Sequence, residues 1–291
     1  MSGQLYLLPC PISEAPALDA LPASTVETAR RIDHFLVEAA RTARATLKAM
    51  GHPKPIAELD SVEIGHDPAP ELISEWLQPV LDGADAAVLS ESGCPGVADP
   101  GAQIAARAHE LGIRVVPLTG PSSILLTLMA SGLDGQRFRF SGYLPKHDAE
   151  RRAAILAAEK ASRASETQLF IETPYRNTAL LDALLETLAP DTRLTVAIDV
   201  TGQNESIRTL TAAAWKAIPK AMRTLPKLPT VFAFLAKPGN RAPRYAPECA
   251  GGKRAHTAPS SKPAVLNNRP KQAFKTHRPE GSPVKTLKGG R

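Results

Sequence analysis

Residues 90–101, S-E-S-G-C-P-G-V-A-D-P-G, form the segment whose composition is best suited to bind a ligand. They follow an apolar run over residues 86–89 that is typical of a strand, and they precede a helical pattern that begins near Ala102. Open α/β sheets bind ligands beyond the carboxyl ends of their strands. Glycines let the backbone approach a ligand closely, and prolines fix the shape of the loop before binding. The spacing therefore predicts either a ligand-binding loop or a plain connection between a strand and a helix.

Short apolar runs and amphipathic stretches alternate through the first part of the chain. The apolar runs predict strands over residues 4–8, 34–38, 56–64, 85–90 and 113–118. The amphipathic stretches predict helices over residues 24–32, 41–50, 69–81 and 102–111. This alternation favours a largely parallel sheet that is covered by helices on both faces.

A second α/β part follows residues 119–121, T-G-P, which are typical of a hinge. Its predicted strands cover residues 138–143, 167–172, 194–200 and 230–235, and its predicted helices cover residues 121–129, 148–161, 176–188 and 211–217. Periodicity leaves open whether some of these strands are antiparallel. We expect a domain over residues 1–119, a second α/β domain over residues 120–237, and a ligand cleft between them.

The charge of the chain is concentrated at its carboxyl end. Residues 238–291 contain twelve Lys/Arg and two Asp/Glu, whereas residues 1–237 have a net charge of −4. Eight prolines and six glycines without apolar spacing predict a disordered basic tail over residues 238–291. Such a tail favours RNA as a partner, because its charge attracts phosphate, although a solvated tail without a partner has the same composition.

Five motifs in this order resemble the tetrapyrrole (corrin/porphyrin) methylase superfamily. Residues 90–101 are similar to its segment S-D-A-G-x-P-x-x-S-D-P-G. The other four are L-Y-L-L-P-C-P-I at residues 5–12, V-V-P-L-T-G-P-S-S at 115–123, F-S-G-Y-L-P at 140–145 and F-I-E-T-P-Y-R at 170–176. The resemblance extends to about Lys237 and is strongest to the branch of 16S rRNA cytidine 2′-O-ribose methyltransferases.

The resemblance implies a two-domain methyltransferase with S-adenosylmethionine as cofactor, without a metal, and it implies a homodimer. The residues that it places around the donor are Pro11, Glu91, Ser92, Gly93, Cys94, Pro95, Ser122, Ser123, Ile171 and Glu172. Two of them have structural alternatives. Ser122 stands where a helix N-cap is expected, and Glu172 is spaced to pair with Arg176.

Glu38 and Arg41 are the candidate catalytic residues, because residues 38–42 stand where the rRNA branch has E-D-T-R-x-T. A carboxylate at a strand end that faces a cleft is suited to act as a general base or to orient a hydroxyl. Alternatively, Glu38 interacts favourably with the dipole of the following helix. Arg41 is expected to pair with Glu38 or to hold a phosphate.

Several departures from the rRNA branch lie on the acceptor side. Glu91 replaces an aspartate, Ala39 replaces an acidic residue, residues 9–14 lack a Gly-Asn pair, and residues 199–205 lack a lysine. The leading interpretation is methylation of a ribosomal RNA ribose 2′-hydroxyl. A tetrapyrrole or other small-molecule acceptor, and an RNA-binding paralogue that has lost catalysis, stay open as alternatives.

Three cysteines without a C-x-x-C pair, no signal peptide and no apolar run of about 18 residues predict a cytoplasmic protein that does not enter a membrane. Cys94 lies in the predicted ligand loop, where a packing role and a reactive thiol are the two alternatives.

Overall fold

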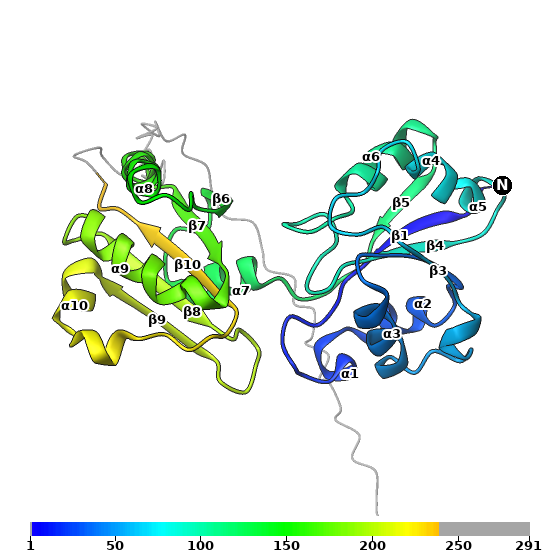
Figure 1. The fold of residues 1–291 in the computed structure, drawn as a ribbon, viewed down its shortest axis with the longest axis horizontal. Coiled ribbons are helices and arrows are strands. Elements are labelled where there is room, and N and C mark those ends of the chain that lie inside the picture. The colour runs from blue at the N-terminus through cyan, green and yellow to red at the C-terminus, as the bar shows by residue number, and fades with distance from the viewer. Residues whose placement is uncertain (1, 239–291) are drawn as a thin grey trace, which may run out of the picture. The chain divides into compact units, whose positions relative to one another are not determined.

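A computed structural model describes residues 2–238, which form two five-stranded sheets (Figure 1). The α/β fold class predicted from the sequence is confirmed. Beyond Pro238, the predicted basic tail lies outside the described residues. The predicted domain limits, 1–119 and 120–237, stay predictions.

The first sheet is parallel and has the strand order β3-β2-β4-β1-β5. Its strands are β1 (Gln4–Leu8), β2 (His34–Val37), β3 (Asp60–Glu63), β4 (Ala86–Leu89) and β5 (Arg114–Pro117). Because all five strands run in the same direction, the loops that follow them leave from one edge of the sheet.

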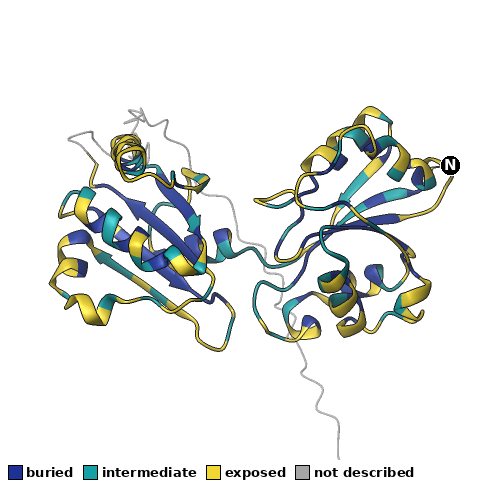
Figure 2. Cartoon of the chain, viewed as in Figure 1, coloured by how far each residue is buried: buried dark blue, intermediate teal, exposed yellow. Residues whose placement is uncertain are grey.

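Side chains of the central strands alternate between two cores, as the two-residue period of a strand requires. In β2, Phe35 and Val37 pack against α1 (Ala17–Ala20), α2 (Ala23–Ala29) and α3 (Ala40–Ala49). Leu36 points to the opposite face, which α4 (Ile73–Trp76), α5 (Gln78–Leu81) and α6 (Ala102–Glu110) cover. Both faces are therefore apolar, and the buried strands stand out in Figure 2.

The second sheet is mixed, with the order β6-β7-β10-β8-β9. Its strands are β6 (Phe138–Tyr143), β7 (Thr167–Glu172), β8 (Arg193–Ile198), β9 (Ser206–Thr211) and β10 (Thr230–Leu235). Only β6 and β7 pair in parallel, whereas β10 runs antiparallel to β7 and β8, and β9 antiparallel to β8. The structure thus answers the question of strand direction that periodicity left open.

Helices cover both faces of this sheet as well. On one face, α8 (Asp148–Ser162), α9 (Asn177–Thr187) and α10 (Ala212–Ala217) pack against the phenylalanines of β7 and β10. On the other face, α7 (Ser123–Ser131) contributes Ile124 and Leu128 to a smaller core. Among the described residues, no helix is long and apolar enough to cross a membrane.

Three predictions about the elements were wrong. The strand expected over residues 56–64 begins with the 3-10 helix η1 (Ile56–Glu58), because the carbonyl of Pro55 accepts the N–H of Glu58 in a turn. The helix expected over residues 69–81 is split at Leu77, because Pro79 lacks an N–H and its ring clashes with the preceding turn. Strand β9 was missed, because its side chains are mostly exposed or half-buried and give no apolar run.

Gly120 lies where the chain leaves the first sheet, and we predict that it tolerates no side chain. A Cβ atom at Gly120 would stand 2.3 Å from Cβ of Pro9, whose rigid ring cannot move aside. Gly120→Ala should lower the free energy of unfolding by about 1–3 kcal/mol, as overpacking does, measured by urea denaturation. Gly135→Ala is the matched control, because a Cβ there meets nothing within 4 Å. Equal stability of the two variants would contradict this contact.

Candidate functional site

Loops from the carboxyl ends of four neighbouring strands meet at one edge of the first sheet (Figure 1). They are residues 9–12 after β1, residues 38–39 after β2, residues 90–101 after β4 and residues 118–122 after β5. The loop that is rich in glycine, proline and serine thus lies at a strand end of an α/β sheet, the usual position of a ligand site.

A backbone bridge between Cys10 and Gly93 fixes two of these loops to each other. The N–H of Cys10 donates to the carbonyl of Gly93 at 2.8 Å, and the N–H of Gly93 donates to the carbonyl of Cys10 at 3.2 Å. Gly93 has a backbone φ angle of 73°, which residues with a side chain rarely adopt. A Cβ atom there would lie 3.4 Å from Cγ2 of Ile12. The bridge therefore requires glycine at this position of the loop.

The thiols of Cys10 and Cys94 pack these loops together. Cys10 Sγ donates to the carbonyl of Ser90 at 3.1 Å, and Cys94 Sγ donates to the carbonyl of Pro121 at 3.4 Å. Burial raises the pKa of Cys10 to about 12 and raises the pKa of Cys94. Because the thiolate is the reactive form, these pKa shifts favour the packing role of Cys94 over the reactive one.

A first cavity of about 320 Å³ opens beside the loop. Seven predicted donor residues line it: Ser92, Gly93, Cys94, Ser122, Ser123, Ile171 and Glu172. They come from the loop after β4, the start of α7 and the end of β7, which are far apart in the sequence. The remaining wall combines the hydroxyl of Thr173 with apolar side chains such as Ile124 and Val231.

A second cavity of about 370 Å³ shares Ser92 with the first. Two further predicted residues, Pro11 and Glu91, line it, together with Ser13, Glu14, Asp199, Gln203 and Asn204. Most of the segments in which the sequence departs from the rRNA branch therefore meet around this cavity. The hydroxyl of Ser13 holds two of them together through Thr201, at 3.2 Å from its carbonyl and 3.1 Å from its hydroxyl. Pro95 is buried within the loop and lines neither cavity.

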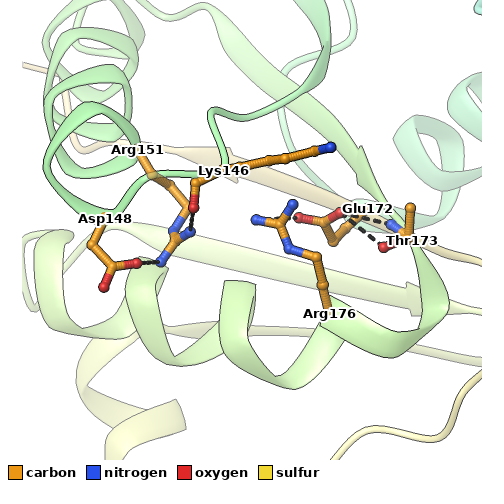
Figure 3. A network of polar contacts seen from close by, with 6 residues as sticks. All are labelled: Lys146, Asp148, Arg151, Glu172, Thr173 and Arg176. Carbon is orange, nitrogen blue, oxygen red and sulfur yellow. Dashed lines mark hydrogen bonds and ion pairs between the residues drawn. The ribbon is translucent and has the colours of Figure 1, made fainter.

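Ser122 and Glu172 combine the structural contacts expected of them with a place in the cavity wall. Ser122 is the N-cap of α7, and its side chain accepts the N–H of Leu125 at 3.5 Å. Glu172 is 1% exposed and lies 3.4 Å from a guanidinium nitrogen of Arg176 (Figure 3). Its other carboxylate oxygen accepts the N–H of Thr173 at 2.8 Å. These contacts fix both side chains in position at the cavity.

Glu38 contacts the predicted ligand loop rather than Arg41. One of its oxygens accepts the N–H of Glu91 at 3.0 Å, and the other lies 3.2 Å from Nδ1 of His66. Glu38 is only 11% exposed, whereas Arg41 is exposed on the first turn of α3, and no ion pair joins the two within residues 2–238. Neither residue lines the two cavities. The position of Glu38 is suited to hold the loop in place.

Asp99 is the carboxyl group of the first cavity that the sequence reasoning did not single out, although it belongs to the predicted loop. Its pKa is raised from 3.8 to about 6, mainly by burial and in second place by the negative charge of Glu38. The hydroxyl of Ser90 and the imidazole of His66 partly offset this effect. A carboxyl group with a raised pKa in a cavity is a candidate acid or base. Its place in the resembling motif, D-P-G, was the available signal.

The family is decided by the extent of the match. The sequence pattern of the tetrapyrrole (corrin/porphyrin) methylases matches residues 17–215, more than half of the chain. This chain belongs to the tetrapyrrole (corrin/porphyrin) methylase family. It is therefore a methyltransferase with S-adenosylmethionine as its cofactor. The first cavity fits this cofactor, because its volume lies in the range of small-molecule sites and its wall offers backbone, hydroxyl and apolar groups.

Relatives agree with this family, and solved structures share the fold. A protein of Vibrio cholerae named ribosomal RNA small subunit methyltransferase I is 30% identical to this chain over 208 residues. The match covers 70% of this chain and 67% of the relative. The protein of the same name from Mesorhizobium japonicum is 33% identical over 210 residues, which cover 72% of this chain and 68% of the relative. The fold is similar to that of a diphthine synthase, with a TM-score of 0.57 and 17% identity over 80% of this chain and 90% of the other. The fold is also similar to that of the methyltransferase CobJ, with a TM-score of 0.54 and 16% identity over 81% of this chain and 95% of the other.

The raised pKa of Asp99 predicts a pH-dependent stability. Between about pH 4 and pH 6 the folded chain holds a proton that the unfolded chain has lost, so this carboxyl group lowers stability as the pH rises. Asp99→Asn should therefore melt at a higher temperature than the unmodified chain at about pH 8 and at a similar temperature at about pH 4. Asp19→Asn, at an exposed position of α1, is the control. A loss of stability at the higher pH would contradict the shift.

Proposed function

We propose that the chain methylates RNA, at a ribose 2′-hydroxyl of ribosomal RNA. The observation that carries this proposal is the first cavity, in which seven of the predicted donor residues lie beside the Asp99 carboxyl group. The names of the relatives support ribosomal RNA as the acceptor. Such an acceptor places the reaction in the cytoplasm, and we propose that the enzyme acts there as a homodimer.

The loop over residues 90–101 and the start of α7 hold the donor in this proposal. Bound S-adenosylmethionine would supply a methyl group on a sulfonium: an oxygen nucleophile would bond to the methyl carbon in line with the carbon–sulfur bond, which breaks and releases S-adenosylhomocysteine. The chain supplies alignment, because the loop is fixed by the bridge from Gly93 to Cys10, and Ser122 is fixed by its capping bond. Buried Glu172 and half-buried Ile171 then close the wall from the end of β7.

The acceptor hydroxyl loses its proton to a carboxylate at the cavity. Asp99 lines the first cavity, and Glu38 raises the pKa of Asp99 while it holds the N–H of Glu91. The two acids thus divide the role that the sequence assigned to Glu38, with Asp99 as proton acceptor and Glu38 as positioning residue. Exposed Arg41, on the first turn of α3, is available to hold a phosphate of the acceptor.

A small-molecule acceptor such as a tetrapyrrole is the second candidate, because most of the segments that depart from the rRNA branch line the second cavity. The two candidates are tested by offering the enzyme labelled S-adenosylmethionine with small ribosomal subunits and, in a parallel reaction, with a uroporphyrinoid. Label in RNA that resists base hydrolysis of the neighbouring phosphodiester supports ribose methylation. Label only in a uroporphyrinoid would replace RNA as the acceptor, and no transfer to either would leave an RNA-binding paralogue.

The donor position predicts the effect of a bulky side chain at Ser92, an exposed residue that lines both cavities. Ser92→Trp should weaken S-adenosylhomocysteine binding by about tenfold or more, which corresponds to at least about 1.4 kcal/mol. Calorimetric titration of the full chain measures this change. Ser24→Trp, at an exposed position of α2, should bind as the unmodified chain does. If Ser92→Trp bound S-adenosylhomocysteine as tightly as the unmodified chain does, the donor could not bind in the first cavity.

The role of Asp99 as proton acceptor predicts how the rate of methyl transfer depends on pH. Asp99 accepts a proton only when it is ionised, so the rate should rise through about pH 6 and then level off. Asp99→Asn should lose this rise. Glu38→Gln should shift the rise to lower pH, because Glu38 raises the pKa of Asp99. A rise that persists in Asp99→Asn and disappears in Glu38→Gln would make Glu38 the proton acceptor instead.

A further inference from the structure

Tyr175 is an exposed aromatic side chain next to the first cavity. It lies in the 3-10 helix η2 (Pro174–Arg176) and is 80% exposed, whereas the preceding Thr173 and Pro174 line the cavity. The residue that follows, Arg176, holds Glu172 at the cavity wall (Figure 3). The ring of Tyr175 therefore stands at the edge of the proposed active site without being part of a core.

A lysine from a distant part of the sequence lies on this ring. Nζ of Lys227 is 5.0 Å from the centre of the Tyr175 ring. The segment that carries Lys227 is bound to the start of α9, because Asn177 Nδ2 donates to the carbonyl of Leu228 at 2.8 Å and Thr178 Oγ1 accepts the N–H of Leu225 at 2.9 Å. Two half-buried hydrogen bonds thus hold the segment of Lys227 beside the segment of Tyr175.

The part of the chain that carries Lys227 is rich in positive charge. Residues 206–237 contain six Lys/Arg and no Asp/Glu, whereas residues 1–237 as a whole have a net charge of −4. In η3 (Lys220–Arg223), Lys220 and Arg223 lie 3.4 and 3.7 Å from the same carboxylate, Asp182. One carboxylate cannot neutralise two cations, so the segment that carries Lys227 keeps an excess of positive charge.

We propose that Tyr175 and Lys227 form a stacking platform for the single-stranded RNA that carries the acceptor ribose; this inference rests on the proposed function. A splayed-out base stacks on the Tyr175 ring, while Lys227 and the cations of η3 contact the backbone phosphates. An exposed ring beside cations suits a single strand, because the bases of a duplex are already stacked on each other and cannot use it.

The test measures binding of a short single-stranded oligoribonucleotide that carries 2-aminopurine to the full chain. Fluorescence anisotropy gives the affinity, and quenching of 2-aminopurine reports base stacking. Tyr175→Ala should weaken binding by roughly 5- to 100-fold and abolish the quenching, as removal of a stacked aromatic does. Tyr175→Phe keeps the ring and should retain both signals.

The phosphate contact is tested by the salt dependence of the same binding. Lys227→Gln should weaken binding and reduce the slope of log affinity against log salt by about one. Lys160→Gln is the matched control, because Lys160 is exposed in the last turn of α8 and lines neither cavity. The basic residues 239–291 are present in every variant, so they contribute equally to each comparison.

Titration of S-adenosylhomocysteine separates this inference from the proposed function. Tyr175→Ala that loses RNA but keeps the donor supports the platform. Equal RNA affinity and equal quenching in Tyr175→Ala and the unmodified chain would overturn the platform and leave the methyltransferase intact. Loss of binding in Tyr175→Phe as well would also overturn stacking, because the hydroxyl would then be the essential group. Tight binding of a duplex but not of the single strand would overturn it equally.

Discussion

The parallel pairing of β1 with β4 on one side and β5 on the other is the constraint on which the site depends. It brings residues that are about 80 positions apart (β1 and β4) and about 110 positions apart (β1 and β5) to one edge, where the bridge between Cys10 and Gly93 continues the pairing into the loops. Through this bridge, the irregular loop over residues 90–101 is fixed by backbone hydrogen bonds like those between the strands of a sheet. The loop over residues 90–101 is thereby shaped before a ligand arrives, which would lower the entropy cost of aligning the proposed donor and acceptor.

The same edge also concentrates negative charge, which costs stability. Glu38 reaches it from β2, and Asp99 reaches it from the loop after β4, where burial already disfavours ionisation. A neutral residue at position 99 would suit the fold better at neutral pH. In the proposed function, this carboxyl group accepts the proton of the acceptor hydroxyl, and that role offsets its cost to the fold.

Local patterns in the sequence predict what local physics decides. Period-two and helical patterns located most strands and helices, and the spacing of Glu172 and Arg176 predicted an ion pair that forms. The sequence could not show that Glu38 bonds the loop instead of Arg41, because this contact joins residues 53 positions apart. For the same reason the raised pKa of Asp99 was hidden, since it depends on burial and on the approach of Glu38. Nor could it show that Pro95 lies inside the loop and not at its surface.

The distribution of charge around the two cavities gives an acceptor strand one favourable path. Glu14, Glu91 and Asp199 line the second cavity, so a phosphate that entered it would meet carboxylates and lose its hydration. Residues 206–237 carry only positive charge, and Lys227 lies two residues before Pro229, which lines both cavities. The backbone of the RNA acceptor that we propose would therefore be attracted to the segment around Lys227 and repelled from the cavities. Only the uncharged ribose and base would then approach Asp99, which is the orientation that the proposed ribose methylation requires.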